Sequence, residues 1–271
     1  MIKDGTALLI EHNTELTESN ILVPEGSVDK KYIIKGIFMQ SDIKMRNQSP
    51  VRMTYKKKVN SKYFEKIDSV EKAYFLGLLF ADGNLYNNTI TLSLKRCDRD
   101  ILEKFKSSIE GEMSIYDYKN ESILKFSDKV FKEFLLNQGI SPNKSLTIKY
   151  PKIKKCFDRH FIRGYFDGDG CVSIHTDKRN GSRRGQVNIC SGSKSFIEDL
   201  VDKLVAYTNI RKNKIRCPNG VYNVIDWGGL SDVEKIYEFL YKDTDLYLDR
   251  KKKTFDIVMD INKSKTKYRK K

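Results

Sequence analysis

Two aspartates, Asp82 and Asp169, occupy the same sequence context, each closing an apolar stretch and standing directly before a glycine. The stretches read AYFLGLLFADGNLY (73–86) and FIRGYFDGDGCVSI (161–174). Each predicts a helix that ends at its acid, where the helix dipole leaves roughly half a negative charge and disfavours a carboxylate. A divalent cation would compensate for these acids and for the unpaired carbonyls of the helix ends, and oxygen ligands favour Mg²⁺, Ca²⁺ or Mn²⁺. We therefore predict that Asp82 and Asp169, with the main-chain carbonyls of Ala81 and Gly168, bind divalent metal ions.

Small residues recur along both of these predicted helices. Ala73, Gly77 and Ala81 are spaced four apart in the first, and Gly164 and Gly168 have the same spacing in the second. A glycine costs a helix interior about 1 kcal/mol relative to alanine, so two helices that accept it indicate close packing of one backbone on the other. An Asp-Gly pair after one helix is also an ordinary turn. Two copies, each with a small-residue face, favour a paired site instead.

Other common sites fit the sequence poorly. The DGDGCV segment lacks the third ligand and the glutamate of an EF-hand, and the glycine-rich nucleotide-binding loops have no match. Five cysteines without a C-x-x-C pair and three histidines do not make a zinc site or a disulfide framework, which indicates reduced thiols.

The segments around the two aspartates predict a repeated order of elements. Each half reads αββαββα, which is an α+β fold with an internal duplication of about 90 residues. In the first half we expect helices at 70–81, 98–109 and 128–138, the last capped by Ser127 and stopped by Gly139, and strands at 89–95, 113–118 and 122–127. In the second half we expect helices at 157–168, 194–208 and 231–241, and strands at 171–176, 185–191, 213–218 and 221–227.

Four regions follow from this order. Residues 1–60 form an N-terminal extension that is compatible either with a small helical DNA-binding unit, such as a helix-turn-helix, or with an irregular segment. Residues 61–150 and 151–262 are the two repeats, and 263–271 is a basic tail that we expect to be disordered.

The charge balance indicates a polyanionic partner. Lysine and arginine number 51 against 36 acids, which gives a formal net charge of +15 and a pI of about 9.4. Polar residues that alternate along the predicted strands could contact base edges, and the basic loop around 177–185 could contact phosphates. The candidate DNA-binding residues are Thr91, Ser93, Lys95, Lys178, Arg179, Arg183, Arg184, Gln186, Asn188, Lys214, Arg216 and Arg250.

The sequence shows neither an apolar run of about 18 residues nor a signal peptide. We therefore expect a protein without a membrane partner in the cytoplasm of a bacterial or phage-infected cell, or one that an organelle encodes.

The two acidic motifs resemble the signature of the LAGLIDADG homing endonucleases, in particular the single-chain kind with two motifs. FLGLLFADG (75–83) and IRGYFDGDG (162–170) align with its nine letters, and both keep the central glycine, the metal-binding acid and the final glycine. The departures are Phe80 in place of the first acid, and Leu76 and Arg163 in place of the alanine. The resemblance extends over roughly 63–261.

This resemblance implies two packed motif helices beneath a pair of four-stranded antiparallel sheets that form a saddle on DNA. It implies a monomer that uses Mg²⁺ to hydrolyse one phosphodiester on each strand of a long, nearly asymmetric double-stranded site. Members often carry a basic residue near each active centre, and here Lys144, Lys251 and the neighbouring Arg250 occupy such positions. Lys144 and Lys251 would polarise the attacked phosphate or organise water.

Two other functions remain compatible with the sequence: an RNA maturase that binds its own intron RNA, and a DNA-binding regulator that does not cleave. The presence of both Asp82 and Asp169 favours the enzyme, since a pure binder gains nothing from clustered acids. The chain starts at Met1 and ends at Lys271, without the Cys or Ser start and the His-Asn end that protein splicing needs. We therefore expect a free-standing or intron-encoded endonuclease.

Overall fold

The computed structural model describes residues 58–141, 146–176, 178–179, 181–218 and 220–269, and two short strands near the N-terminus. The chain divides into two units, 1–55 and 56–271. In the first unit, β1 (Ile21–Leu22) pairs antiparallel with β2 (Ile33–Ile34). The helical unit considered for residues 1–60 falls almost entirely outside the described residues.

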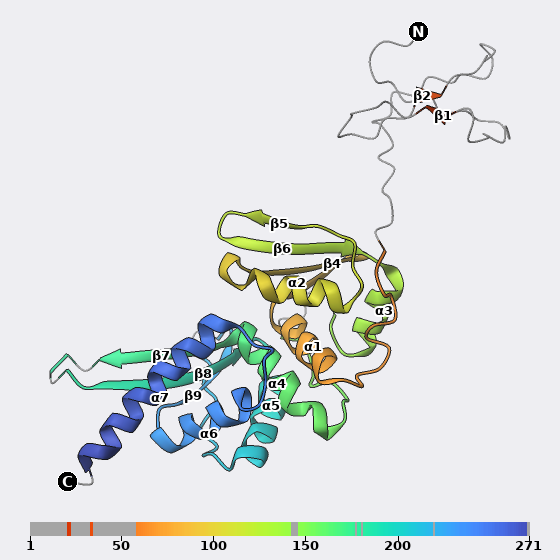
Figure 1. The fold of residues 1–271 in the computed structure, drawn as a ribbon. Helices are drawn as coiled ribbons and strands as arrows, with labels where there is room; N and C mark the ends of the chain where they lie inside the picture. The colour runs from red at the N-terminus through yellow and green to blue at the C-terminus, as the bar shows by residue number, and fades with distance from the viewer. Residues whose placement is uncertain are drawn as a thin grey trace. The chain divides into compact units, whose positions relative to one another are not determined.

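The second unit contains the two repeats; the first follows the predicted order of elements, and the second departs from it by one strand and one additional helix (Figure 1). The first repeat consists of α1 (Val70–Asp82), β3 (Gly83–Tyr86), β4 (Thr89–Lys95), the short 3-10 helix η3 (Arg96–Asp98), α2 (Arg99–Ser108), β5 (Ile115–Tyr118), β6 (Glu121–Ser127) and α3 (Lys129–Asn137). The second consists of α4 (Lys155–Asp169), β7 (Gly170–Thr176), β8 (Arg183–Ser191), α5 (Lys194–Thr208), β9 (Asn223–Trp227), α6 (Leu230–Tyr241) and α7 (Asp249–Arg269).

Each repeat builds one antiparallel sheet. The first has four strands in the order β3-β4-β6-β5, the number that the family resemblance implies, and β3 is a strand that the sequence analysis did not place. The second has three strands among the described residues, in the order β7-β8-β9. The strand predicted at 213–218 does not form, and a single bridge between Arg216 and Val224 takes its place. Pro218, which has no N–H to donate to a sheet, closes this segment.

Local sequence signals account for most of the helix ends. The hydroxyl of Ser69 accepts a hydrogen bond from the Lys72 N–H at 3.1 Å and so begins α1. The cap of α3 is Asp128, not the predicted Ser127, and its carboxylate accepts from the Phe131 N–H at 2.8 Å. Both residue types cap well, and the ionised carboxylate is the stronger acceptor.

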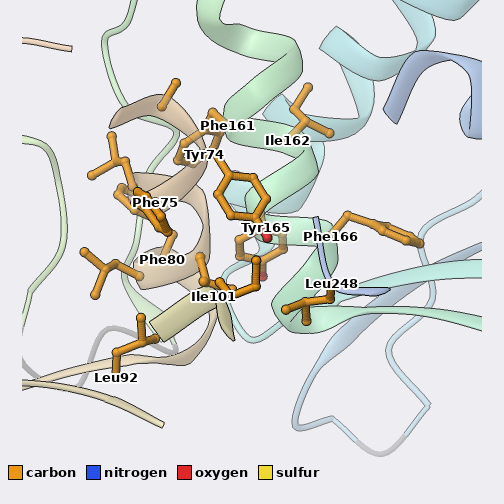
Figure 2. Close-up of a cluster of buried hydrophobic side chains, with 14 of the residues drawn as sticks. Tyr74, Phe75, Phe80, Leu92, Ile101, Phe161, Ile162, Tyr165, Phe166 and Leu248 are labelled. Carbon is orange, nitrogen blue, oxygen red and sulfur yellow. The ribbon is translucent and has the colours of Figure 1, made fainter. Parts of the chain in front are cut away.

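The core lies between the sheets and the helices. Ile90, Leu92 and Leu94 of β4 are buried, as their alternation predicts, while the residues between them face outward. Helices α2 and α3 pack on the inner face of the first sheet, and α5, α6 and α7 on that of the second. Figure 2 shows aromatic side chains, among them Tyr74, Phe80 and Phe161, filling the space around α1 and α4. Each sheet therefore has one covered face and one polar face.

Helix α7 was not predicted, and it replaces the expected disordered tail as far as Arg269. Phe255, Val258 and Met259 of this helix are buried and have helical spacing. At its start, Arg250 Nε donates to Asp98 Oδ2 of the first repeat at 2.6 Å, while the Asp98 side chain is only 1% exposed. The start of α7 therefore joins the two repeats through an ion pair.

Replacing Arg250 with alanine should lower the free energy of unfolding by about 2 kcal/mol, because Asp98 would be left as a buried charge without its cation. Adding Asp98→Asn to Arg250→Ala should restore much of that stability, since the buried group is then neutral. Urea unfolding of both variants measures the difference. Equal stabilities of the single and double variants would contradict this account of the pair.

Candidate active site

The two motif helices touch along their backbones, as their small residues predict. A Cβ added at Gly77 of α1 would lie 2.1 Å from the Phe161 carbonyl oxygen of α4, and one added at Gly164 of α4 would lie 2.0 Å from the Tyr74 carbonyl oxygen of α1. Gly77 of α1 thus contacts the backbone of α4, and Gly164 of α4 contacts the backbone of α1. This reciprocal contact is like that of a two-fold dimer. Only glycine permits this approach.

This packing carries the two aspartates to one end of the helix pair. Asp82 is the last residue of α1 and Asp169 the last of α4, as predicted. A Cβ added at Gly168 would lie 2.2 Å from the Ala81 Cβ and 2.9 Å from Asp82 Oδ2, so the Asp82 carboxylate lies directly against the end of α4. Asp82 is exposed and Asp169 is half-buried. The structure thus gathers two carboxylates and two helix C-termini at the centre of the unit.

Lys251 at the start of α7 supplies a cation to this site. Its ammonium donates to the carbonyl oxygens of Phe166 at 2.7 Å, Gly168 at 3.0 Å and Gly170 at 2.5 Å. The side chain is 7% exposed, and burial lowers the pKa of this ammonium to about 8. All three N–H donors are directed at the end of α4. Lys251 therefore caps the helix that ends in Asp169, and its predicted role, to polarise the attacked phosphate or to organise water, stays a prediction.

The first acid of the second motif, Asp167, is completely buried behind this site. Its carboxylate accepts from the hydroxyls of Tyr74 and Tyr241, both at 2.8 Å, and from the Leu248 N–H at 2.9 Å. Burial raises the pKa of Asp167, and the nearby Lys251 ammonium opposes that rise. Asp167 thus ties α4 to α1, to α6 and to the segment that leads into Lys251.

Arg163, a departure from the motif, reinforces the same connection. Its buried guanidinium donates to the Leu246 carbonyl at 2.9 Å and lies over the Tyr74 ring, 5.4 Å from the ring centroid. The segment between α6 and α7 is therefore held on both sides by residues of the second motif.

A cavity of about 220 Å³ opens beside Asp169. Cys190 lies in its wall and donates from Sγ to the Asp169 carbonyl at 3.3 Å, while burial raises the pKa of its thiol. Tyr165 donates from its hydroxyl to the Cys190 carbonyl at 2.9 Å. The lining residues are Phe80, Ala81, Ile148, Tyr165, Asp169, Cys190, Ser191, Gly192 and Tyr222.

The donor set suits a hard divalent cation. Within the described part of the chain, no three His, Cys, Asp or Glu side chains come together as a metal site. Asp82 and Asp169 provide carboxylates and the helix ends provide carbonyls, all oxygen donors of the kind that Mg²⁺ takes. The Gly168 carbonyl, predicted as a ligand, already accepts from Lys251. Phosphate and water oxygens would have to complete the coordination.

The outer face of the first sheet carries the predicted polar residues. Thr91, Ser93 and Lys95 of β4 point away from the core, with Lys95 exposed. The register places further exposed residues on the same face, and sequence analysis missed them: Asn84, Tyr86, Tyr116, Tyr118 and Lys125. For Tyr116, Tyr118 and Lys125, the alternation of apolar and polar residues in IYDYKNESILKFS (115–127) was a signal of an outward-facing side chain.

The outer face of the second sheet carries the remaining candidates. Gln186 and Asn188 alternate with the buried Val187 and Ile189, so they lie on the outer face of β8. The other predicted residues described on or beside this sheet are exposed: Lys178, Arg179, Arg183, Arg184, Lys214 and Arg216. Arg250 forms an ion pair with Asp98, and Lys144 lies outside the described residues.

Comparisons with known proteins relate this chain to LAGLIDADG proteins in sequence and in fold. Residues 157–242 match the model of the LAGLIDADG-like domain. The fold resembles that of the LAGLIDADG homing endonuclease I-GzeII in complex with its DNA target, with a TM-score of 0.54, 12% identity and coverage of 72% of this chain and 91% of that one. It also resembles the LAGLIDADG meganuclease I-AabMI bound to uncleaved DNA, with a TM-score of 0.52, 17% identity and coverage of 71% and 91%.

Two archaeal proteins from Methanocaldococcus jannaschii show similarity in sequence. A probable translation initiation factor IF-2 is 27% identical over 214 residues, covering 71% of this chain and 17% of that protein. The DNA-directed RNA polymerase subunit Rpo1C is 25% identical over 202 residues, covering 71% and 21%. The chain thus spans about a fifth of the length of the curated relatives it matches. Residues 157–242 thus match the LAGLIDADG-like domain, and the described fold is similar to that of LAGLIDADG homing endonucleases.

Proposed function

We propose that this protein is a site-specific endonuclease that hydrolyses one phosphodiester on each strand of double-stranded DNA, with Mg²⁺ or Mn²⁺ as the cofactor. The observation that carries the proposal is the meeting of Asp82 and the Asp169-bearing end of α4 at the reciprocal glycine contact. A binder of DNA would be weakened by two carboxylates placed where the backbone phosphates must come closest. A hydrolase needs them, because they would hold a metal ion able to activate water near neutral pH.

In this proposal, different residues of the chain would hold the metal, position the site and contact the bases. Asp82 and Asp169 would hold the metal against the scissile phosphates. Lys251 would fix the carbonyls at the end of α4, which sets the direction of the Asp169 side chain. The polar faces of the two sheets would contact the bases on either side of the cut.

The relatives are consistent with a module that works independently of its surroundings. The two relatives are named as a translation factor and a polymerase subunit. In each of them, the segment that matches this chain makes up only about a fifth of the relative's own length. The matching segment is therefore a minor part of each of those proteins. We propose that it acts on DNA as a single chain, because both motifs lie in one molecule.

Cleavage of DNA from the neighbourhood of the gene, with the gene itself removed, tests the proposal. With Mg²⁺ or Mn²⁺ we expect double-strand breaks at one defined site, and no breaks in EDTA. Sequence-specific binding without cleavage by either metal would instead support the non-cleaving DNA-binding regulator. Tighter binding to the gene's own intron RNA than to any DNA would support the RNA maturase.

The outer face of the first sheet yields a prediction on salt dependence. Lys95→Ala with Lys125→Ala should reduce the slope of log affinity against log salt by up to about 2, since each phosphate contact contributes roughly 0.9. Lys104→Ala with Lys129→Ala is the matched control, because these lysines lie on α2 and α3. Filter binding between 50 and 200 mM salt, a range in which the slope is well measured, distinguishes the pairs. Equal slopes would place the DNA on another surface.

A further inference from the structure

An acid stands among the basic and amide side chains of the outer face of the second sheet. Asp226 of β9 lies opposite Asn188 in the register with β8, between Ile225 and Trp227, which are both buried. Its side chain therefore faces outward with those of Gln186 and Asn188. The bridge from Arg216 to Val224 brings Arg216 to the same face. No part of the proposed cleavage chemistry uses this carboxylate.

Both oxygens of Asp226 are engaged by side chains of the predicted DNA-binding set. Oδ1 accepts from Gln186 Nε2 at 3.0 Å, and Oδ2 accepts from Arg216 Nη2. The Asp226 main-chain carbonyl accepts from Asn213 Nδ2 at 2.6 Å, which anchors the segment before Arg216. The Arg216 side chain remains 55% exposed, whereas that of Asp226 is 22% exposed. The acid is thus the inner partner and the arginine the outer one.

This arrangement changes what Arg216 can offer to DNA. A guanidinium has five N–H donors in a fixed plane, so the contact through Nη2 orients the group and leaves donors for a second partner. The neighbouring carboxylate also cancels much of the arginine's attraction for any phosphate. Directed hydrogen bonds, such as those of arginine to guanine or of an amide to adenine, depend on geometry and survive this cancellation.

We infer that Asp226 determines sequence specificity: it presets Arg216 and Gln186 for reading base edges in the major groove, and its charge weakens binding to unrelated DNA. The inference rests on the DNA-reading part of the proposed function and is independent of cleavage. Asp226 is a positioning residue in this role, because Arg216 and Gln186 would make the contacts to the bases.

Selection of binding sites from a randomised duplex library, in EDTA so that no strand is cut, tests the inference. The parent chain should enrich a long site, and Asp226→Asn should lose its preference over two or three adjacent base pairs of one half-site. We expect discrimination at those pairs to fall about tenfold or more. Affinity for random duplex DNA should rise about threefold to tenfold in the same variant, because one negative charge has left the face.

Two variants and a control separate this role from a structural one. Arg216→Ala should lose preference at the same base pairs while binding random DNA no more tightly, and Gln186→Ala should lose part of it. Asp117→Asn removes a similar acid, which accepts from Arg99 Nη1 at 2.8 Å, but on the helix side of the first sheet. This control should keep the full preference, and thermal unfolding should show all four variants folded.

The outcomes distinguish the inference from the proposed function. If Asp226→Asn selects the same site as the parent with the same discrimination, the inference is wrong while the endonuclease proposal stands. If Asp226→Asn loses affinity for random and selected DNA alike, the residue is structural and the inference is again wrong. If the parent chain shows no sequence preference at all, both this inference and the DNA-reading part of the proposed function are wrong.

Discussion

Asp82→Asn and Asp169→Asn should each lower the rate of double-strand cleavage by about a thousandfold or more, a barrier increase of roughly 4 kcal/mol. The amide keeps the size of the carboxylate but loses the charge that, in the proposed function, would hold a divalent cation able to activate water and stabilise the leaving oxygen. Because both acids lie at one meeting point of α1 and α4, neither should replace the other. Cleavage of the mapped site under single-turnover conditions measures the loss.

DNA affinity provides the accompanying measurement. Both variants should bind the target in EDTA as tightly as the parent or more tightly, because a negative charge has been removed from beside the phosphates. Asp68→Asn is a matched control at the opposite end of α1, where the exposed acid pairs with Lys72. This variant should cut at the parental rate. Parental cutting by either Asp82→Asn or Asp169→Asn would exclude the assigned metal site.

Sequence periodicity was sufficient to predict the elements that make the framework of the site. The apolar run before each acid, the alternation in β4 and the helix caps are local signals, and local hydrogen bonds and burial satisfy them. The contact of α1 with α4 was also predictable, because a glycine four residues from another small residue has little other use inside a helix. The meeting of the two aspartates was therefore predictable from the sequence.

Residues whose role depends on distant segments could not be predicted in the same way. Lys251 lies in a run of basic residues that reads as a solvated surface, and only α7 carries it into the end of α4. Asp167 aligns with a motif acid, yet its three hydrogen-bond donors come from Tyr74, Tyr241 and Leu248, in α1, in α6 and beyond it. The segment 213–218 was predicted as a strand. Instead, the Asn213 side chain donates a hydrogen bond to the Asp226 main-chain carbonyl, and only Arg216 forms a β-bridge, with Val224.

The second large effect is expected from the helix contact itself. Gly77→Ala should lower the free energy of unfolding by about 3 kcal/mol, although alanine is the better helix former by about 1 kcal/mol. The added methyl group would lie 2.1 Å from the Phe161 carbonyl oxygen, and helix backbone cannot turn aside as a flexible side chain can. In Gly164→Ala the added methyl group would lie against the Tyr74 carbonyl oxygen in the same way. The double variant with both substitutions should therefore fail to fold cooperatively.

Gly228→Ala is the matched control for the helix contact, since a Cβ there would meet no atom within 4 Å. Its stability should stay within about 0.5 kcal/mol of the parent.

Urea unfolding followed by circular dichroism compares the variants. Cleavage by Gly77→Ala below its unfolding midpoint shows how separation of the two helices changes the cleavage rate. We expect cutting to fall even where the variant is folded, because the end of α1 that carries Asp82 must shift from the end of α4. A Gly77→Ala protein with parental stability and parental cutting would mean that the two helices do not meet at these glycines, and the origin of the paired acidic site would have to be sought elsewhere.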